Sequence, residues 1–140
     1  MVLLNGNWLG ISDYTNEVLE GTYSAYFQAD AVAPGNSASL SQTGDIPSEA
    51  KSLRFTTSRH PPIIFADTPR ECWHLHLLLN GKDVPYPAVG VGDSFVRWAA
   101  DVSSLAGKTS EIRFLVETGY PGTSSPPWDV GVAIALDAIR

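Results

Sequence analysis

The stretch from Phe95 to Glu117 constrains the fold of this chain more than any other part of the sequence. In residues 95–100 and again in residues 111–117, apolar side chains occupy every second position, and most of the positions between them hold charged or small side chains. This alternation is typical of a β-strand that buries one of its two faces. The stretch therefore predicts two strands, which we expect to form the central pair of an all-β fold. The apolar positions expected to face the core are Val96, Trp98, Ala100, Ile112, Phe114 and Val116.

Four residues between these strands predict how the turn closes. Asp101 and Ser103 have short polar side chains that can hydrogen-bond to nearby backbone. Leu105 can pack beneath the turn, and Gly107 can adopt a positive φ without steric cost. We therefore expect a compact, ordered turn.

The rest of the chain also consists of short apolar segments between turns rich in glycine and proline. The further strands expected are Tyr23–Ala29, Ser37–Thr43, Lys51–Ser58, Trp73–Leu79, Val84–Val89 and Val130–Arg140. Asn80–Gly81 is a strong hairpin signal, and the prolines after it predict that Val84–Val89 returns as an edge strand. The almost wholly apolar Val130–Arg140 predicts a central strand, and residues 1–22 read as a loop-rich segment. We expect one domain over residues 1–140, a two-sheet antiparallel β-sandwich or jelly roll.

Charge and cysteine content exclude several classes of function. Nine basic and fifteen acidic residues give a formal net charge of −6, which argues against nucleic acid and anionic membrane surfaces, because phosphate binding requires clustered Lys and Arg. No run of eighteen apolar residues exists, so we expect no membrane insertion. Cys72 is the single cysteine; it cannot form a disulfide within the chain, and we expect it to be a small buried apolar residue.

Four segments in a fixed order carry a resemblance to a known family. They are LSQTGDIPSEAKSLRF, LLLNGKDVPY, FVRWAADVSSLAGKTSEIRF and VGVAIALDAIR. Over about residues 20–140 the chain resembles the galactose-binding-like jelly-roll modules. It resembles most those of exported bacterial proteins, including proteins with a PEP-CTERM sorting tail, and non-catalytic carbohydrate-binding modules. The resemblance implies an extracellular or cell-surface location.

The same resemblance implies a structural calcium ion, Ca2+, that joins the N-terminal loop to the last strand. Asp137 stands where the acidic ligand of that strand is expected. Backbone carbonyls around Asn5–Asn7 or Glu20 would complete the site. Ala138 stands where the family has a second acidic residue.

Binding residues on sandwich scaffolds concentrate in loops, and four side chains in predicted loops suit a sugar. Tyr120 and Trp128 can stack on the apolar face of a sugar ring, while Arg59 and His60 can supply directional hydrogen bonds. These four residues are the predicted glycan contacts. The alternative is that the two aromatic rings hold the proline-rich loop Gly119–Asp129 against the domain.

Two histidines raise a separate question. His74 and His76 lie two residues apart on a predicted strand and therefore share a face. One hypothesis is a zinc site, with His60 or a carboxylate as third ligand. The other is a solvated sheet face, on which the histidines lie beside Glu111 and Arg113.

The sequence lacks the common catalytic motifs, so we expect no enzymatic activity. It contains no G-x-S-x-G, H-E-x-x-H, P-loop or G-x-G-x-x-G segment. The leading hypothesis is a non-catalytic recognition module that binds a glycan or polysaccharide. The second is a structural module that pairs with other domains, or with itself, through an edge strand such as Val84–Val89 or through an apolar face. A hydrolase with an unrecognised site is the third.

Overall fold

A computed structural model of the chain describes residues 2–6, 8–12, 24–30, 37–58, 73–118 and 131–137. For the first two strands, the last strand and most of the third, the description covers the backbone alone. The strands are β1 (Val2–Gly6), β2 (Trp8–Ser12), β3 (Ser24–Asp30), β4 (Ser37–Asp45), β5 (Ser52–Ser58), β6 (Trp73–Leu79), β7 (Lys82–Asp83), β8 (Ala88–Val91), β9 (Phe95–Asp101), β10 (Thr109–Thr118) and β11 (Gly131–Asp137).

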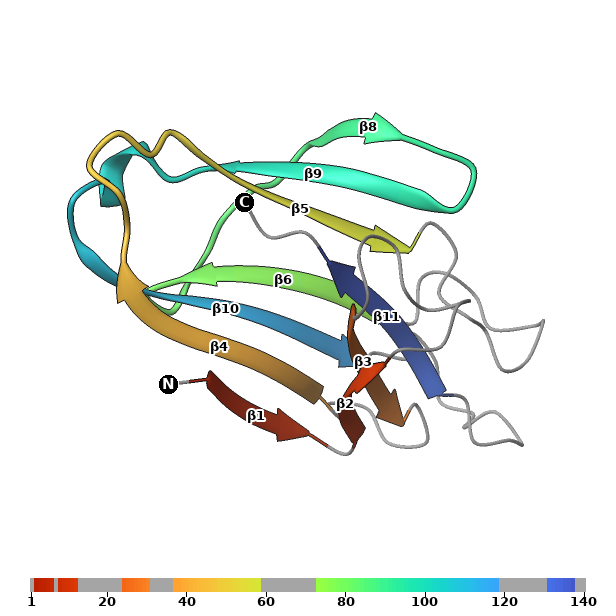
Figure 1. Cartoon of the computed structure of the whole chain (residues 1–140). Helices are drawn as coiled ribbons and strands as arrows, with labels where there is room; N and C mark the ends of the chain where they lie inside the picture. The colour runs from red at the N-terminus through yellow and green to blue at the C-terminus, as the bar shows by residue number, and fades with distance from the viewer. Residues whose placement is uncertain are drawn as a thin grey trace.

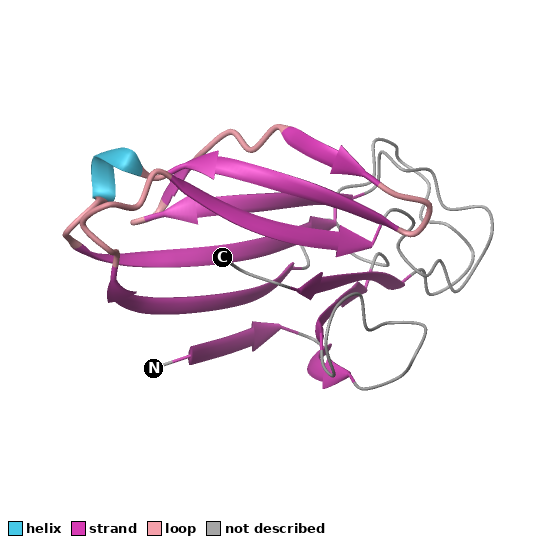
Figure 2. Cartoon of the chain, turned by 45° about the horizontal axis from the view of Figure 1, so that its top comes forward, coloured by secondary structure: helices cyan, strands magenta, loops and turns pink. Residues whose placement is uncertain are grey.

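These strands form two facing sheets (Figure 1). The first sheet has the order β1-β4-β10-β6-β7, and the second has the order β2-β3-β11-β5-β9-β8. Every pairing is antiparallel. The predicted all-β, two-sheet antiparallel sandwich is thus confirmed (Figure 2). The described helical structure is the single turn η2 (Ser103–Leu105), and no helix among the described residues is long and apolar enough to cross a membrane.

The N-terminal segment differs from the loop that the sequence led us to expect. Strand β1 pairs with β4 from Val2↔Gln42 to Gly6↔Ala38, and β2 pairs with β3. The two strands are therefore edge strands, one in each sheet. Local preference for strand is weak in segments that contain Asn and Gly, and pairing with a longer neighbour overrides it.

Strands β9 and β10, expected as a central pair, lie in different sheets. Strand β9 pairs with β5 and β8, whereas β10 pairs with β4 and β6. The predicted faces are confirmed, since Ala100 and Phe114 are buried and Arg97 is exposed. Period-two alternation fixes which face of a strand is buried, and two strands that face each other across a core satisfy it as well as two neighbours do.

The turn between β9 and β10 has the predicted details. The carboxylate Oδ1 of Asp101 accepts hydrogen bonds from Ser103 N at 2.8 Å and Ser103 Oγ at 2.6 Å. These two bonds lower the pKa of the Asp101 carboxyl. Leu105 packs against the core, and Gly107 has φ +72°.

The predicted return strand Val84–Val89 is divided between the two sheets. Asn80 and Gly81 form the expected tight turn, with φ of 49° and 77°. Only the two residues of β7 then pair back onto β6, and β8 is the edge strand of the second sheet. The reason is that Pro85 and Pro87 cannot donate ladder hydrogen bonds. The edge position is therefore correct for β8, but its neighbour is β9.

The last strand is central, as predicted, because β11 lies between β3 and β5 in the second sheet. It pairs with β3 over six residue pairs and with β5 at Leu136 and Asp137.

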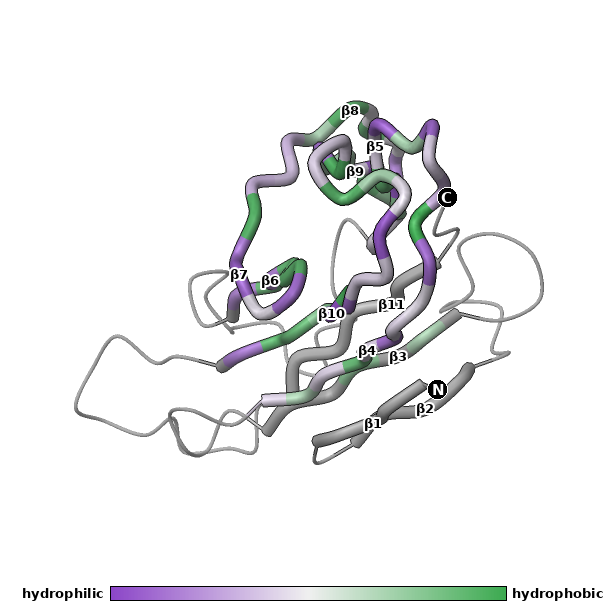
Figure 3. Tube along the Cα trace, turned by 90° about the vertical axis from the view of Figure 1, so that its left-hand side faces the viewer, coloured by the Kyte–Doolittle hydropathy of each residue, from purple (hydrophilic) through white to green (hydrophobic). Residues whose placement is uncertain are grey.

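An aromatic cluster fills the described core between the two sheets. The ring of Phe55 contacts that of Phe114 in the opposite sheet, with 4.9 Å between centroids, and it lies 5.4 Å from Tyr86. Tyr86 in turn contacts Trp98 edge to face at 5.4 Å. Figure 3 shows the two layers end on, with β4, β10 and β6 in one and β5, β9 and β8 in the other. The buried apolar residues are Phe27, Ala38, Leu53, Phe55, Leu75, Leu77, Leu79, Ala100, Val102, Phe114 and Val116.

Candidate functional site

Most of the residues that the sequence singled out for binding lie outside the described part of the chain. The glycan contacts predicted in loops therefore stay predictions, as does the calcium ion. Asp137 ends β11 and pairs with Thr56; its side chain is not among those described. Of the residues that the sequence analysis discussed for binding, metal ligation or cysteine chemistry, those outside the described ranges are Asn7, Glu20, Arg59, His60, Cys72, Tyr120, Trp128 and Ala138.

The described residues instead form a cavity of about 240 Å³ over β4 and β10. The register pairs Phe114 with Leu40 and Ile112 with Gln42, and cross-strand partners project to the same face of a sheet. Because Phe114 is in the core, the cavity lies on the inner face of the first sheet. The described residues that line it are Leu40, Gln42, Gly44, Asp45, Ile46, Ser110, Ile112 and Phe114.

Along the inner face of β4, the side chains become more exposed toward the end of the strand, and the cavity lies at that exposed end. Ala38 is fully buried, Leu40 is half-buried, and both Gln42 and Gly44 are exposed. A Cβ atom placed on Gly44 would meet nothing within 4 Å. The absence of a side chain at this inward position therefore leaves open space where a longer residue would project.

The turn after β9 holds one wall of the cavity. Ile46 N donates to the carbonyl of Lys108 at 3.0 Å, and Gly107 N donates to the carbonyl of Ile46 at 3.0 Å. Asp45 is fixed nearby, since its Oδ1 accepts a hydrogen bond from Thr109 Oγ1 at 2.5 Å. The wall is thus tied to β10 by main-chain and side-chain contacts together.

Polar groups around the cavity keep hydrogen-bonding capacity. Ser110 is 2% exposed, and its Oγ accepts a bond from Asn80 Nδ2 at 3.3 Å, so its own hydroxyl hydrogen remains to be donated. Asp45 keeps Oδ2 as an acceptor. The amide of Gln42 makes no hydrogen bond to any described residue. An aliphatic wall and a few convergent polar groups are the composition of a small-ligand site.

The sequence contains a signal for this cavity that our sequence analysis missed. The inward positions of SASLSQTGD change from Leu40 to Gln42 to Gly44, from apolar to polar to no side chain. The strand was predicted as Ser37–Thr43, two residues shorter than β4, and its two faces were not separated. Reading every second residue separately would have located the point at which the core ends.

The two histidines do share a face, as predicted, and their ring centroids lie 6.2 Å apart. His76 lies between two carboxylates, with Nδ1 2.6 Å from Asp83 Oδ2 and Nε2 3.7 Å from Glu117 Oε2. These contacts join β6 to β7 and to β10 on the outer face of the first sheet.

The other contacts described on this outer face are pairs between charged side chains, and the zinc hypothesis stays a prediction. Arg113 Nε donates to Glu111 Oε1 at 2.7 Å, so the charges form local pairs along the sheet. Within the described ranges, no three His, Cys, Asp or Glu side chains are arranged to hold a metal ion. His60, the third ligand of the zinc hypothesis, lies outside those ranges.

The edge of the second sheet is a further exposed feature. Val89 and Val91 of β8 have 58% and 62% of their surface exposed. Strand β8 is terminal in its sheet, and a register shift interrupts its pairing with β9 between Ala88 and Gly90. Such a shift is a feature that hinders edge-to-edge pairing.

Comparison of the sequence with known protein families and with curated proteins finds no match. Solved structures similar to this one include TmCBM61 in complex with β-1,4-galactotriose, at 16% identity and a TM-score of 0.46, covering 97% of this chain and 87% of that chain. They also include the enzymatically active domain of tailspike protein 4 of bacteriophage CBA120, at 16% identity and a TM-score of 0.47, covering 96% of this chain and 18% of that chain. Both TM-scores are below 0.5, so the fold assignment rests on the strand pairing described above.

Proposed function

We propose that this protein is a carbohydrate-binding β-sandwich module and that the cavity over β4 and β10 is part of its binding site. The observation that carries the proposal is the composition of the cavity. Aliphatic side chains of Leu40 and Ile112 face the same space as the free amide of Gln42 and the acceptor Oδ2 of Asp45. A sugar ring has C–H faces that contact apolar groups and hydroxyls that need directional partners, and this lining supplies both.

The wider assignment keeps the expectations drawn from the sequence. The loop residues Arg59, His60, Tyr120 and Trp128 are proposed as additional glycan contacts. A non-catalytic role, an extracellular or cell-surface location and a calcium ion at Asp137 belong to the same proposal. They are supported by the sequence motifs and the family resemblance, including the resemblance to exported bacterial proteins.

A second candidate function is assembly through the edge of the second sheet. The observation in its favour is the exposure of Val89 and Val91 on a terminal strand. An added strand from another copy or another domain would pair with the free backbone of β8. Sedimentation over a range of concentrations tests this function. Assembly predicts a species heavier than the monomer, and Val89→Lys should remove that heavier species.

A glycan array tests the leading proposal, with the purified protein applied in the presence and absence of calcium. Gly44→Leu places a side chain in the cavity, where an added Cβ meets nothing within 4 Å, and we expect it to abolish binding. The matched control is Thr43→Leu, an exposed position on the other face of the same strand, which should leave binding unchanged. Trp128→Ala tests the loop contacts separately.

The outcomes separate the parts of the proposal. Binding that is lost in Gly44→Leu and retained in Thr43→Leu supports the cavity as the site. Binding that survives Gly44→Leu but is lost in Trp128→Ala would place the site in the loops. No binding to any glycan by the folded protein would contradict carbohydrate binding and leave assembly as the stronger candidate.

A further inference from the structure

We infer that the cavity over β4 and β10 receives one uncharged sugar residue, the terminal unit of a glycan, and excludes acidic sugars. This inference rests on the proposed carbohydrate function and specifies its ligand class. Three properties of the described residues carry it: the size of the cavity, its charge and its set of free hydrogen-bonding groups.

Size limits the ligand to about one ring. The cavity has a volume of about 240 Å³, which is below the roughly 300–1,000 Å³ of sites that enclose drug-sized ligands. The described lining runs from Phe114, which is 1% exposed, to Gly44 and Asp45, which are both exposed. A space of this size that runs from the core to the surface accepts the end of a chain, and the next residue of the glycan would lie outside it.

Charge excludes an acidic sugar. Among the described residues that line the cavity, Asp45 is the only one with an ionisable side chain, and that side chain is acidic. A carboxylate on a ligand about 4 Å away would be repelled by about 1 kcal/mol at the dielectric constant of water and about 4 kcal/mol at the effective value near a protein surface. The formal net charge of −6 adds a repulsion of the same sign.

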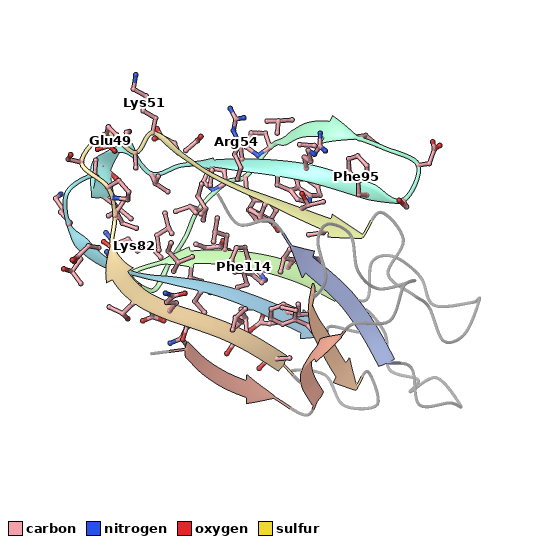
Figure 4. All side chains as sticks on the ribbon, viewed as in Figure 1. Glu49, Lys51, Arg54, Lys82, Phe95 and Phe114 are labelled. Atoms are coloured by element: carbon pink, nitrogen blue, oxygen red, sulfur yellow. The ribbon has the colours of Figure 1, made fainter. Side chains whose placement is uncertain are left out.

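The described cations do not compensate for this charge. Arg113 pairs with Glu111 on the outer face, Arg97 lies over the ring of Phe95 in the second sheet, and Lys108 Nζ donates to the Ser104 carbonyl at 2.8 Å. In Figure 4, Lys51 and Arg54 extend away from the space between the sheets. Neither these five residues nor Lys82, the remaining described Lys or Arg, lines the cavity.

The free polar groups match hydroxyls better than they match a carboxylate. Oδ2 of Asp45 can only accept hydrogen bonds, the amide of Gln42 can both donate and accept, and Ser110 has one hydrogen to donate. A sugar hydroxyl donates and accepts at once, so adjacent hydroxyls can satisfy all three groups. An ionised carboxylate only accepts, so a carboxylate that faces Oδ2 of Asp45 would leave that atom without a donor.

Titration followed by NMR with matched sugars tests the inference. The probes are D-galactose and D-glucose, each compared with its uronic acid, in which C6 is a carboxylate. We expect the best neutral sugar to bind at least about tenfold more tightly than its uronate, a difference of about 1.4 kcal/mol. Asp45→Asn should reduce this ratio toward one, and Gly44→Leu should remove the binding of both sugars.

A second comparison tests the limit of one residue. A trisaccharide that ends in the preferred sugar should bind within about threefold of the monosaccharide, because only its terminal unit enters the cavity. Equal affinity for the uronate, or an affinity for the trisaccharide more than about tenfold higher, would overturn the inference while leaving the carbohydrate function in place. Absence of binding to every sugar and every array glycan would contradict the carbohydrate function itself.

Discussion

The inner face of β10 has two halves that differ in how the opposite sheet packs against them, although both follow the same alternation of one strand. At Phe114 the face is buried, because Phe55 of the second sheet packs against the ring at 4.9 Å between centroids. At Ile112, two residues earlier on the same face, the side chain is only half-buried, and together with Ser110 and Phe114 it lines the cavity. The comparison shows that alternation decides which side chains point inward, whereas packing of the opposite sheet decides how deeply each apolar side chain is buried.

The buried half is sealed by the chain that crosses between the sheets after β7. Tyr86 lies in this crossing and packs against both Phe55 and Trp98. Its hydroxyl donates to the carbonyl of Leu75, which ties the crossing to β6. The cavity half has no equivalent among the described residues, because its wall at Ile46 is held from the side by the turn after β9.

The largest expected effect is the loss of Phe114. Phe114→Ala should lower the free energy of unfolding by about 3–5 kcal/mol, because it removes a buried ring and leaves a cavity. Ile112→Ala, in the other half of the same face, should cost only about 1–2 kcal/mol, since this side chain is half-buried. Urea denaturation of both variants measures the difference, and equal losses would contradict the division of β10 into two halves.

Tyr86→Phe tests the seal with a smaller change. Removal of the hydroxyl should cost about 0.5–1.5 kcal/mol, because the hydrogen bond to the Leu75 carbonyl is lost. Ile46→Val, on the cavity side, is the matched control and should alter stability less.

The pH dependence of unfolding gives Tyr86 a second readout. Burial, and after it the charge of Asp83, raises the pKa of the Tyr86 phenol above its ordinary value. The folded protein therefore retains this proton more strongly than the unfolded chain, so the stabilisation is complete below about pH 10 and is lost as the pH rises through the folded pKa. Tyr86→Phe should flatten the alkaline part of the stability curve, and an unchanged curve would count against a raised pKa of this half-buried phenol.

Much of this fold could be predicted from the sequence, because each strand carries local information. The alternation in β9 and β10, the Asn80–Gly81 turn and the apolar character of β11 all led to correct elements. Strand partners could not be predicted in the same way, since alternation is identical for two neighbours and for two strands that face each other. The N-terminal strands were missed because their pairing with β4 and β3 is a tertiary interaction.

The site could be predicted less well than the fold. Loop aromatics such as Trp128 were chosen for their chemistry, and the structure does not describe them. The cavity depends on where the second sheet stops covering the first, which is a property of two sheets together and not of any one segment. Only the change from Leu40 through Gln42 to Gly44 recorded it in the sequence.

Asp101→Asn tests whether the hydrogen bonds from Ser103 to Asp101 stabilise the turn that holds the cavity wall. Hydrogen bonds from Ser103 lower the pKa of the Asp101 carboxyl, so its stabilising contribution is present above the ordinary value of about 3.9 and is lost as the pH falls through the lower folded pKa. Asp101→Asn should destabilise the protein less than Tyr86→Phe, because the carboxyl is exposed to solvent. The free energies of unfolding of the wild-type protein and Asp101→Asn, measured against pH, should converge at acid pH. A difference that stays constant with pH would show that the carboxylate charge is not involved.

The smallest change in stability is expected where the largest change in binding should occur. Gly44 is exposed, its φ is not positive, and a Cβ added there meets nothing within 4 Å, so Gly44→Leu should alter the free energy of unfolding by no more than about 0.5 kcal/mol. The new side chain nevertheless points toward the cavity and should occupy it. Denaturation of Gly44→Leu and of Thr43→Leu compares an inward with an outward position on the same strand. The comparison therefore tests whether the inward position is covered by the opposite sheet. If Gly44→Leu is destabilised as strongly as Ile112→Ala, then that end of β4 is covered and the cavity is part of the core. If its stability is unchanged, the inward face of β4 ends in open space, which is the geometry a binding site requires.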